Sequence, residues 1–341
     1  MIRSRLMTLI APTLLIVLVA MTAAGVRHYA SPPGGLQLPP LAKGDGDARI
    51  RMGRLAYPRE AIDSDEFLVH VAHPAHRIVS QYWSIDEFVY SVAPPQDVVA
   101  VSESAYVKSI SNVLPSVERF HPVIATDPER VLALDPEIML VSSTGRADYT
   151  SLARSSGVPV YRMQTTFQTL DQVEQSIRLT GYLTGNDDAA EKEAHRFRSA
   201  IEAAKLLRPE GAPHPRILGL GGRYSYGRAT LFNDIVTTLG GINVGAENGL
   251  KGYDPIDFEQ IVRWDPEWIV AEAAPGRIND VLNNLMADPA VSLTRAARNG
   301  HILVLEDHIF LPMSPFTTLI VRAMAEAIYG QSNTSTQRHN D

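Results

Sequence analysis

One pattern of residues occurs twice in the chain and sets its fold class. The first copy, ERVLALDPEIMLV, runs from Glu129 to Val141, and the second, EQIVRWDPEWIVA, runs from Glu259 to Ala271. Each copy begins with Glu, has apolar residues at matching places and contains Asp-Pro-Glu at the same offset. Apolar residues at helical spacing precede the Asp-Pro pair, and a short apolar run follows it. A unit of helix, turn and strand that occurs twice predicts two similar α/β lobes.

Short apolar runs alternate with helical segments on either side of both copies. In the first lobe we expect strands at 77–80, 97–102, 137–143 and 158–163, and helices near 85–92, 128–134 and 149–157. In the second lobe we expect strands at 216–222, 267–273 and 301–307, and helices over 229–241, 257–264 and 314–330. This alternation predicts parallel β-α units. Strands that are apolar throughout predict sheets covered on both faces.

A long helix is expected between the lobes, from Asp187 to Leu207. No Gly or Pro interrupts this segment, and steps of four and three place one set of residues on a single face: Ala190, Ala194, Phe197, Ile201 and Ala204. We therefore predict an α/β fold of two Rossmann-like lobes with mostly parallel sheets, joined by one long rigid helix, with a ligand cleft between them. The predicted boundaries are 71–186 for the N-terminal binding lobe, 187–209 for the inter-lobe helix and 210–330 for the C-terminal binding lobe.

The N-terminus has the composition of an export signal. Arg3 and Arg5 precede an uncharged run from Leu6 to Val26, which is typical of a signal peptide and is also long enough to span a bilayer. Residues 1–26 are therefore expected to insert in or pass through a membrane, either as a cleaved signal or as an inner-membrane anchor, and the rest of the chain is expected to be periplasmic or otherwise extracytoplasmic. Residues 27–70, rich in Pro and Gly, are expected to form a flexible linker and lead-in. The polar end, 331–341, is expected to be a disordered tail.

Composition and motifs argue against several classes of function. The chain has no Cys, which excludes disulfides, thiolate metal sites and a Cys nucleophile. Its formal net charge of −7 gives no basic surplus for nucleic acid. Walker A and nucleophile-elbow spacings are absent. His73 and His76 have metal-like spacing, but they precede the first strand of the lobe. We therefore expect no catalytic residue, no metal site and no cofactor.

The acid that opens each copy has two interpretations. Asp127 and Asp257 are expected to cap the two helices, which places Glu129 and Glu259 at the second helical position. A carboxylate there favours the positive end of the helix dipole by roughly 0.3–1 kcal/mol. Asp-Pro then ends each helix, because the residue before Pro avoids the α region. Alternatively, the two matched acids dock a partner that has two-fold symmetry and basic sockets. The two roles are compatible.

The chain resembles the periplasmic substrate-binding proteins (class III) that serve ABC importers of cobalamin, ferric siderophores and haem. The resemblance covers about residues 55–330 and is carried by both repeated segments, by YPREAIDSDEFLVHVAHPAHRIVS, by GYLTG before the long helix and by TLFNDIVTTLGGIN. It implies two lobes joined by one helix, no enzymatic activity, and delivery of a ligand to a dimeric ABC permease in the inner membrane. In that family one Glu on each lobe contacts Arg residues of the permease, and these positions match Glu129 and Glu259.

The ligand is expected where the strands of both lobes end, because open α/β sheets bind ligands outside the carboxyl ends of their strands. Aromatic and Arg side chains are frequent there, and they offer flat apolar area and a fork for anionic groups. The candidate ligand-binding residues are Tyr82, Trp83, Tyr106, Arg146, Arg223, Tyr224 and His308. The wider set of residues that follow strands also includes Gln81, Phe167, Tyr226, Tyr253, Glu272 and Phe310.

The expected ligand is a bulky metal chelate. The two Arg residues favour a ferric siderophore over a corrinoid or haem. A corrinoid would use the aromatic residues more, and haem could take an axial ligand from Tyr or His308. A bare zinc or manganese ion is disfavoured, because no cluster of His and carboxylates follows the strands. A membrane-anchored ligand sensor without a transport role is the alternative of another class, and the paired acids argue against it.

Overall fold

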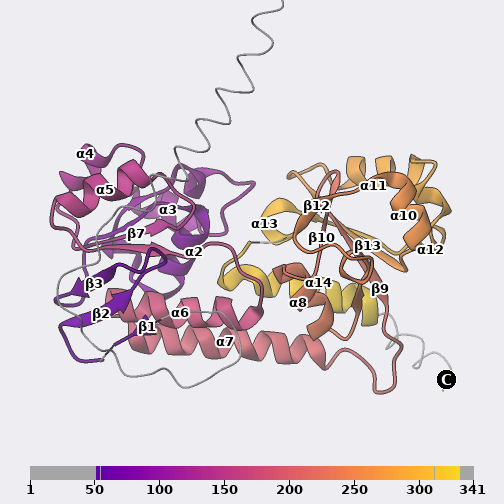
Figure 1. The fold of residues 1–341 in the computed structure, drawn as a ribbon, viewed down its shortest axis with the longest axis horizontal. Coiled ribbons are helices and arrows are strands. Elements are labelled where there is room, and N and C mark those ends of the chain that lie inside the picture. The colour runs from indigo at the N-terminus through magenta and orange to yellow at the C-terminus, as the bar shows by residue number, and fades with distance from the viewer. Residues whose placement is uncertain (1–50, 54, 311, 331–341) are drawn as a thin grey trace, which may run out of the picture. The chain divides into compact units, whose positions relative to one another are not determined.

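The computed structural model of the chain describes residues 51–53, 55–310 and 312–330. The expected signal or anchor (1–26), residues 27–50 of the expected linker and the expected tail (331–341) lie outside the described residues. The described part is a two-lobed α/β structure whose larger sheets are parallel (Figure 1). The predicted fold class is therefore confirmed.

A five-stranded parallel sheet forms the centre of the N-terminal lobe. Its strand order is β6-β5-β4-β7-β8. The strands are β4 (Ile78–Ser80), β5 (Val98–Val101), β6 (Val123–Ile124), β7 (Ile138–Ser142) and β8 (Val160–Met163). Every residue of β7 is buried, as expected of a strand that is covered on both faces.

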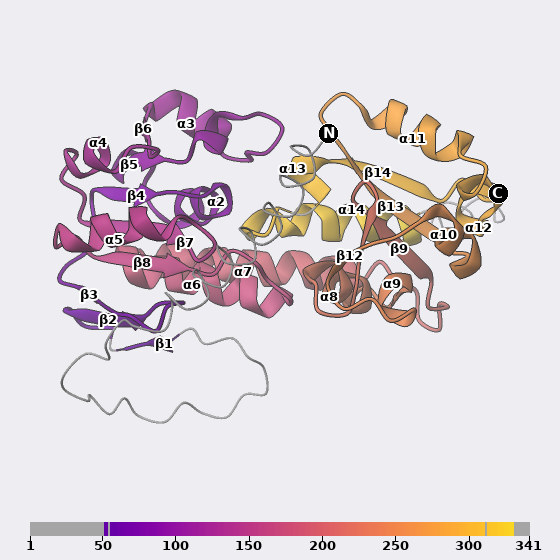
Figure 2. The same cartoon turned by 45° about the horizontal axis from the view of Figure 1, so that its top comes forward.

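Helices cover both faces of this sheet (Figures 1 and 2). Neighbouring residues of β4 point to opposite sides, since Ile78 packs in the cluster formed with α2 and α6, whereas Val79 packs with α4 and α5. The helical segments are α2 (Trp83–Val92), η1 (Pro95–Asp97), η2 (Glu103–Tyr106), α3 (Leu114–Phe120), α4 (Pro128–Leu132), α5 (Ala147–Ser155) and α6 (Leu170–Thr184).

The C-terminal lobe repeats this plan with a four-stranded parallel sheet in the order β11-β9-β13-β14. Its strands are β9 (Arg216–Leu220), β11 (Ile242–Asn243), β13 (Trp268–Ala273) and β14 (Ile302–Glu306). Its helical segments are α8 (Leu231–Thr238), α9 (Val244–Glu247), α10 (Phe258–Trp264), α11 (Ile278–Ala287), η3 (Val291–Leu293), α12 (Arg295–Arg298), α13 (Asp307–Phe310), η4 (Pro315–Thr317) and α14 (Thr318–Tyr329). An antiparallel ribbon of β10 (Tyr224–Tyr226) and β12 (Tyr253–Pro255) is an addition that the β-α pattern did not predict.

Helix α7 (Asp187–Lys205) runs below both lobes in Figure 1 and packs on α6 and α14. It ends at Lys205 rather than at the predicted Leu207. The predicted inward face is buried at every position: Ala190, Ala194, Phe197, Ile201 and Ala204. The close approach of α6 requires Gly181, because a Cβ at that position would clash with the Cβ of Ala190.

A small antiparallel sheet lies where a flexible connector was expected. Strands β1 (Arg51–Met52), β2 (Arg59–Ile62) and β3 (Leu68–Val71) pair in that order. The expectation of a flexible linker is therefore wrong for residues 59–70. The physical reason is a period-two pattern, in which Ala61, Val69 and Val71 point into the core of the lobe between exposed or partly exposed neighbours.

Arg59 ties this small sheet to the start of α7. Its side chain is only 6% exposed, and it donates to the carbonyl of Tyr182 at 2.7 Å and to the carboxylate of Asp187 at 2.6 Å. The guanidinium also lies over the rings of Tyr57 and Tyr182, 4.3 and 4.9 Å from their centroids. A buried charge is tolerated only with such partners, so Arg59 fixes β2 against the joint of α6 and α7.

The caps that the sequence predicted for the repeated helices are confirmed. The carboxylate of Asp127 accepts from the backbone N–H of Glu129 at 3.0 Å, and that of Asp257 accepts from the N–H of Gln260 at 2.7 Å. Glu129 and Glu259 consequently lie at the second position of α4 and α10. A carboxylate at this position faces the unpaired N–H groups of the helix start.

The Asp-Pro-Glu motif forms an unexpected hydrogen-bonded clamp in the N-terminal lobe. Asp135 has a φ of 52°, a left-handed conformation that turns the chain after α4. Glu137 then accepts from the backbone N–H of Arg77 at 3.1 Å, and the side chain of Arg77 donates to the carbonyl of Leu134 at 2.7 Å. The clamp joins the end of a helix to the amino ends of β4 and β7.

The second copy builds the same clamp in the C-terminal lobe. Asp265 has a φ of 42°. Glu267 accepts from the backbone N–H of Arg216 at 2.9 Å, and the side chain of Arg216 donates to the carbonyl of Trp264 at 2.8 Å. We call the pairs Arg77–Glu137 and Arg216–Glu267 the Arg–Glu clamps. They explain why Asp, Pro and Glu recur together at one offset.

We predict that Glu137→Ala and Glu267→Ala each lower the free energy of unfolding by about 1–3 kcal/mol, because each leaves partly buried N–H donors without an acceptor. Urea denaturation followed by circular dichroism measures the change. The control is Glu202→Ala on α7, which removes an exposed pair with Lys205 (2.9 Å) and is expected to cost less than about 1 kcal/mol. Losses no larger than the control would contradict the role of the clamps.

Candidate ligand cleft

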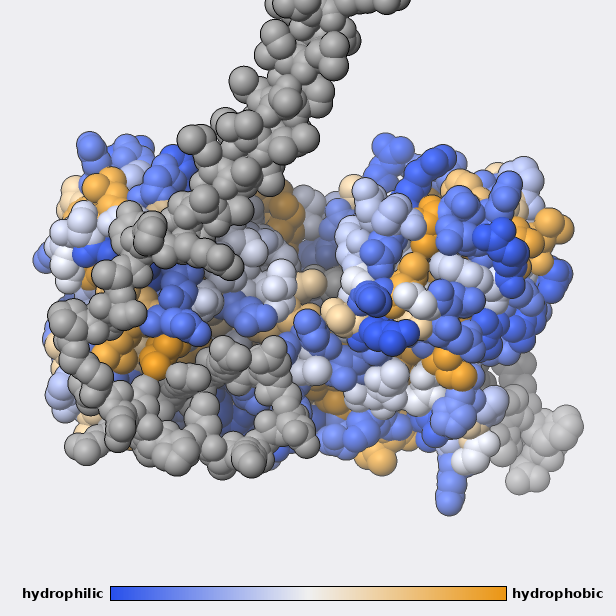
Figure 3. Space-filling model, in the orientation of Figure 1, coloured by the Kyte–Doolittle hydropathy of each residue, from blue (hydrophilic) through white to orange (hydrophobic). Residues whose placement is uncertain are grey.

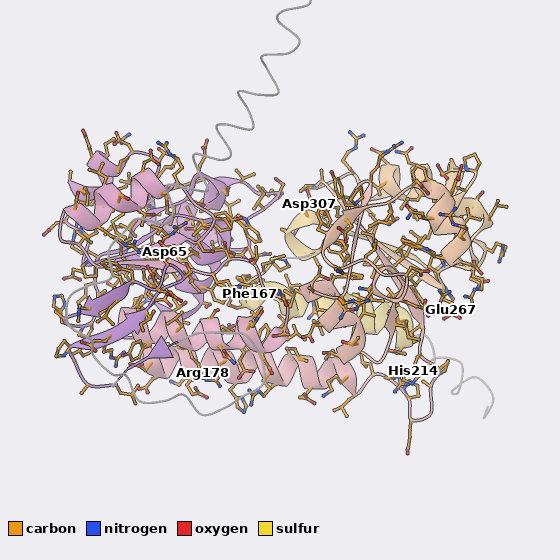
Figure 4. All side chains as sticks on the ribbon, in the orientation of Figure 1. Asp65, Phe167, Arg178, His214, Glu267 and Asp307 are labelled. Carbon is orange, nitrogen blue, oxygen red and sulfur yellow. The ribbon has the colours of Figure 1, made fainter. Side chains whose placement is uncertain are left out.

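The surface is hollowed between the two lobes (Figure 3). Strand β14 ends at this hollow, since Asp307, the residue after it, lies on the margin of the C-terminal lobe that faces the N-terminal lobe (Figure 4). Strands β9 and β13 run parallel to β14, so the residues that follow them lie at the same edge. Open α/β sheets bind ligands at this edge, and we call the hollow the candidate cleft.

Tyr82 and Trp83 follow β4 and begin α2. Tyr82 is the N-cap residue and Trp83 is the first helical residue, and both are partly exposed. Their ring centroids are 5.8 Å apart with a tilt of 36°, and Tyr82 also packs against the core of its lobe. The two rings give the end of the central strand an aromatic surface. This geometry is compatible with ligand binding, and that role stays a prediction.

Tyr106 and Arg146 each have a polar partner within the N-terminal lobe. The hydroxyl of Tyr106 donates to the carbonyl of Pro122 at 2.7 Å, and burial raises the pKa of this phenol. Arg146 is exposed, but its guanidinium forms an ion pair with Asp148 two residues later. Sequence spacing places both residues after strands, yet it does not reveal that each has a polar partner nearby.

Arg223 and Tyr224 follow β9, as the sequence predicted, and both are exposed. The guanidinium of Arg223 lies 5.9 Å from the ring centroid of Phe258, the first residue of α10. The ring of Tyr224 stacks on Tyr253, with centroids 4.8 Å apart and planes 18° apart. The ribbon of β10 and β12 thus presents a stacked pair of tyrosines, one from each of two strands that the β-α pattern did not predict.

Three polar groups meet beside Gly221, at the end of β9. The hydroxyl of Tyr253 donates to the carbonyl of Gly221 at 3.0 Å. A Cβ on Gly221 would lie 2.5 Å from the oxygen of Tyr253, 2.9 Å from that of Tyr226 and 3.1 Å from a carboxylate oxygen of Glu272. Burial and the nearby Asp307 raise the pKa of Glu272. Only glycine leaves room for this cluster.

His308 connects the lobes through its backbone. Its carbonyl accepts from the side-chain amide of Asn112, in the N-terminal lobe, at 2.9 Å. The side chain is partly exposed, and its Nδ1 lies 3.6 Å from Glu306. Among the described residues, no group of three or more His, Asp or Glu side chains is arranged to hold a metal ion.

A buried carboxylate completes the junction between the lobes. Glu87 on α2 accepts from the backbone N–H and the side-chain amide of Asn112, at 2.9 and 2.8 Å, and from the hydroxyl of Ser314 in the C-terminal lobe. Its neighbour Asp86 is equally buried and accepts from Ser80 and Ser102. No Arg or Lys forms an ion pair with either acid within the described part of the chain. Burial therefore raises the pKa of each carboxyl to about 7.

We predict that the lobe junction makes folding dependent on pH. The native state holds protons on these acids that the unfolded chain releases above its ordinary carboxyl pKa, so the stabilisation is complete below about pH 4 and is lost as the pH rises through about 7. Glu87→Gln, whose amide does not ionise, should lose less free energy of unfolding than the wild type between about pH 5 and pH 8. Each unit of raised pKa contributes about 1.4 kcal/mol to this difference.

Urea denaturation at several pH values measures the effect, with Glu118→Gln on the exposed face of α3 as the matched control. Because Asp86 remains, part of the slope should remain in Glu87→Gln. Identical slopes in the wild type and Glu87→Gln would contradict the prediction.

Glu129 and Glu259 are both exposed at the starts of matching helices, one in each lobe. Neither forms an ion pair with any residue that the structure describes. Their charges are thus available to a partner. This arrangement is what the docking interpretation requires, and the docking itself stays a prediction.

Comparison with known proteins identifies the family. A model of the periplasmic binding protein family matches residues 78–308, which is more than half of the chain. The chain belongs to the periplasmic binding protein family. Family membership confirms the resemblance to binding proteins of cobalamin and haem importers, and it makes this periplasmic binding protein a carrier of ligand rather than an enzyme.

Curated relatives of this periplasmic binding protein are named for corrinoids. A cobalamin-binding protein of Halobacterium salinarum is 25% identical over 322 residues, which cover 93% of this chain and 84% of the relative. A vitamin B12-binding protein of Vibrio cholerae is 23% identical over 199 residues, which cover 58% of this chain and 70% of the relative.

Solved structures of similar fold include haem-binding proteins. The periplasmic heme-binding protein RhuT from Roseiflexus sp. RS-1, in apo form, has a TM-score of 0.61 and 24% identity, and the match covers 74% of this chain and 98% of that one. The heme-binding protein HmuT has a TM-score of 0.63 and 21% identity, with 84% and 96% covered. At these identities the structures support the fold of the periplasmic binding protein and no particular ligand.

Members of this family deliver small-molecule ligands to ABC permeases and work outside the cytoplasm, so the location predicted for the binding lobes is extracytoplasmic. No helix in the described part of the periplasmic binding protein is both long enough and apolar enough to cross a membrane. The expected signal peptide or anchor at residues 1–26 lies outside that part and stays a prediction.

Proposed function

We propose that this protein is the extracytoplasmic binding component of an ABC importer and that its ligand is a corrinoid. The observation that carries the choice of ligand is the stacked pair Tyr224–Tyr253 at the cleft edge. A relative that matches most of the chain and is named for cobalamin supports the same choice. Stacked aromatic rings offer flat apolar area with a polar rim. A large ligand with an extended ring system and amide groups at its edge suits such a surface.

A ferric siderophore, which the sequence favoured, is the second candidate. That preference depended on Arg146 and Arg223 as partners for an anionic chelate. Arg146 is already paired with Asp148, which leaves Arg223 as the one of the two that has no acid partner within the described residues. A single exposed Arg on the face of Phe258 gives weaker support for an anion than two converging guanidinium groups would.

We predict that cyanocobalamin or cobinamide quenches the emission of Trp83, whereas ferric hydroxamates, catecholates and citrate do not. A corrinoid absorbs where tryptophan emits, so a ligand beside α2 lowers the fluorescence. Trp83→Phe should abolish most of the quenching. Trp264→Phe is the matched control, because Trp264 lies at the end of α10, beside the Arg–Glu clamp, and should leave the quenching intact.

Quenching by the ferric chelates without any effect of the corrinoids would replace the proposed ligand with a siderophore. The visible spectrum of the protein isolated from its own source provides an independent reading, because bound corrinoids and ferric chelates have different absorption bands.

Docking to a permease dimer is supported by the two exposed acids at equivalent positions of the two lobes. A dimeric partner presents each basic socket twice, which matches one carboxylate per lobe. The Asp127 and Asp257 caps hold both helix starts in place without help from Glu129 or Glu259. The two glutamates can therefore be removed without unfolding their helices.

We predict that the double variant Glu129→Ala/Glu259→Ala abolishes import of the ligand and leaves its affinity for the binding protein nearly unchanged. Uptake of labelled cobalamin by cells and titration of the purified protein measure the two quantities. The control is Glu118→Ala/Glu202→Ala, which removes two other exposed carboxylates and should leave uptake intact. Normal uptake by the Glu129/Glu259 double variant would rule out the docking role.

A further inference from the structure

A ladder of aromatic rings leads from the core of the C-terminal lobe to the cleft edge. Tyr226, which is 7% exposed, packs on Phe232 at 5.1 Å and on Phe310 at 5.7 Å between centroids. Tyr253 packs on Tyr226 at 5.0 Å, and Tyr224 stacks on Tyr253. The outer two rings are 49% and 43% exposed, respectively. Buried rings thus hold an exposed tyrosine pair in a fixed place.

The hydroxyl of Tyr253 is held by a hydrogen bond, in addition to the packing of its ring. Tyr253 donates its proton to the carbonyl of Gly221. The oxygens of Tyr226 and Glu272 lie at the same glycine, which has no side chain to separate them. Tyr226 and Tyr253 also hydrogen-bond each other through their hydroxyls. The carboxylate of Glu272 therefore lies beside two phenols at the end of the central strand of the lobe.

The groups that face Tyr253 all disfavour a negative charge on its oxygen, except for one hydrogen bond. Burial and the carboxylate of Glu272 raise the pKa of Tyr253, Tyr224 adds to this effect, and the bond with Tyr226 opposes it. Burial and Glu272 likewise raise the pKa of Tyr226. Glu272 itself is neighboured by Asp307, and no cation pairs with it among the described residues. Both phenols are consequently neutral hydrogen-bonding groups at neutral pH.

Neutral phenols suit the two ring-shaped metal ligands very differently. A protein holds haem iron through an axial His, Cys, Met or Tyr, and tyrosine binds ferric iron as the phenolate. A corrinoid carries carboxamide groups around its ring, and these exchange hydrogen bonds with neutral donors and acceptors. A carboxylate that opposes phenolate formation therefore penalises haem and leaves a corrinoid unaffected.

We propose that Glu272 is a positioning residue that holds the Tyr253 hydroxyl as a neutral hydrogen-bonding group at the cleft edge, and thereby makes the cleft select a corrinoid over haem. The inference rests on the proposed function, because it assumes that a metal macrocycle binds between the lobes. It adds to that function a residue that sets selectivity without itself being the main contact surface.

The test compares the wild type with Glu272→Gln and with Glu272→Gln/Tyr253→Phe. Cobinamide and haemin are titrated against each protein, the tyrosinate–iron charge-transfer band is recorded, and phenol ionisation is followed by ultraviolet absorbance as the pH is raised. Glu306→Gln is the matched control, because it removes a carboxylate from the adjacent strand that does not act on Tyr253.

In the wild type we expect cobinamide to bind and haemin to give no tyrosinate band. In Glu272→Gln the ratio of haemin to cobinamide affinity should rise about tenfold or more, because the negative charge that opposes a phenolate on Tyr253 is removed. The band should appear, and phenol ionisation should begin at lower pH. The added Tyr253→Phe change should remove the band. The control should match the wild type.

A tyrosinate band in the wild type would overturn the inference, as would an unchanged affinity ratio in Glu272→Gln. Those two results leave the proposed function standing if cobinamide still binds to the wild type. Failure of the wild type to bind cobinamide would instead reject the corrinoid function, and the proposed selectivity would fall with it.

Discussion

The Arg–Glu clamps hold the frame on which the rest of the structure depends. In each lobe a carboxylate that begins one strand accepts from the N–H at the start of its neighbour, and the Arg at that start binds the last carbonyls of the preceding helix. One side chain thereby satisfies groups that a helix leaves unpaired at its end. Both clamps lie at the amino edge of the sheet, so the carboxyl edge is left free for loops that contact a ligand.

The two lobes meet at a junction that contains a buried carboxylate. In each clamp the Glu accepts from a backbone N–H and the Arg side chain donates to a backbone carbonyl. At the junction the carboxylate of Glu87 is buried and accepts from Asn112 and Ser314. A buried acid without a cation is costly to ionise. We therefore expect the contact between the lobes to respond to protons through Glu87, and the interior of the N-terminal lobe to respond through Asp86.

The sequence predicted well those elements that depend on residues close together in the chain. The parallel strands, the caps Asp127 and Asp257, and the inward face of α7 all follow from local spacing. The small sheet of residues 51–71 was missed because its Pro and Gly content outweighed a short alternation of apolar residues. The β10–β12 ribbon was missed because its strands are separated by α8 and α9, so their pairing depends on tertiary contacts.

The candidate site was less predictable than the fold, because its side-chain partners also depend on tertiary contacts. Position after a strand predicted that Tyr224 lies beyond the end of β9, but it could not show that Tyr106 bonds to Pro122 or that Arg146 pairs with Asp148. These partners are chosen by side-chain geometry. Glu272 was expected after a strand but lies within β13, and its relation to two phenols arises only because Gly221 lacks a Cβ.

The attachment of the lead-in has a mechanical consequence. Tension on the chain before residue 51 enters the described structure through β1 and passes to β2, whose Arg59 is bonded to Tyr182 and Asp187. The small sheet is also bonded to β8, since Arg162 donates its backbone N–H to Asp63 at 3.2 Å and Tyr161 donates its hydroxyl to the carbonyl of Ile62 at 3.1 Å. Tension on β1 is therefore shared between the joint of α6 with α7 and the edge strand β8 of the large sheet.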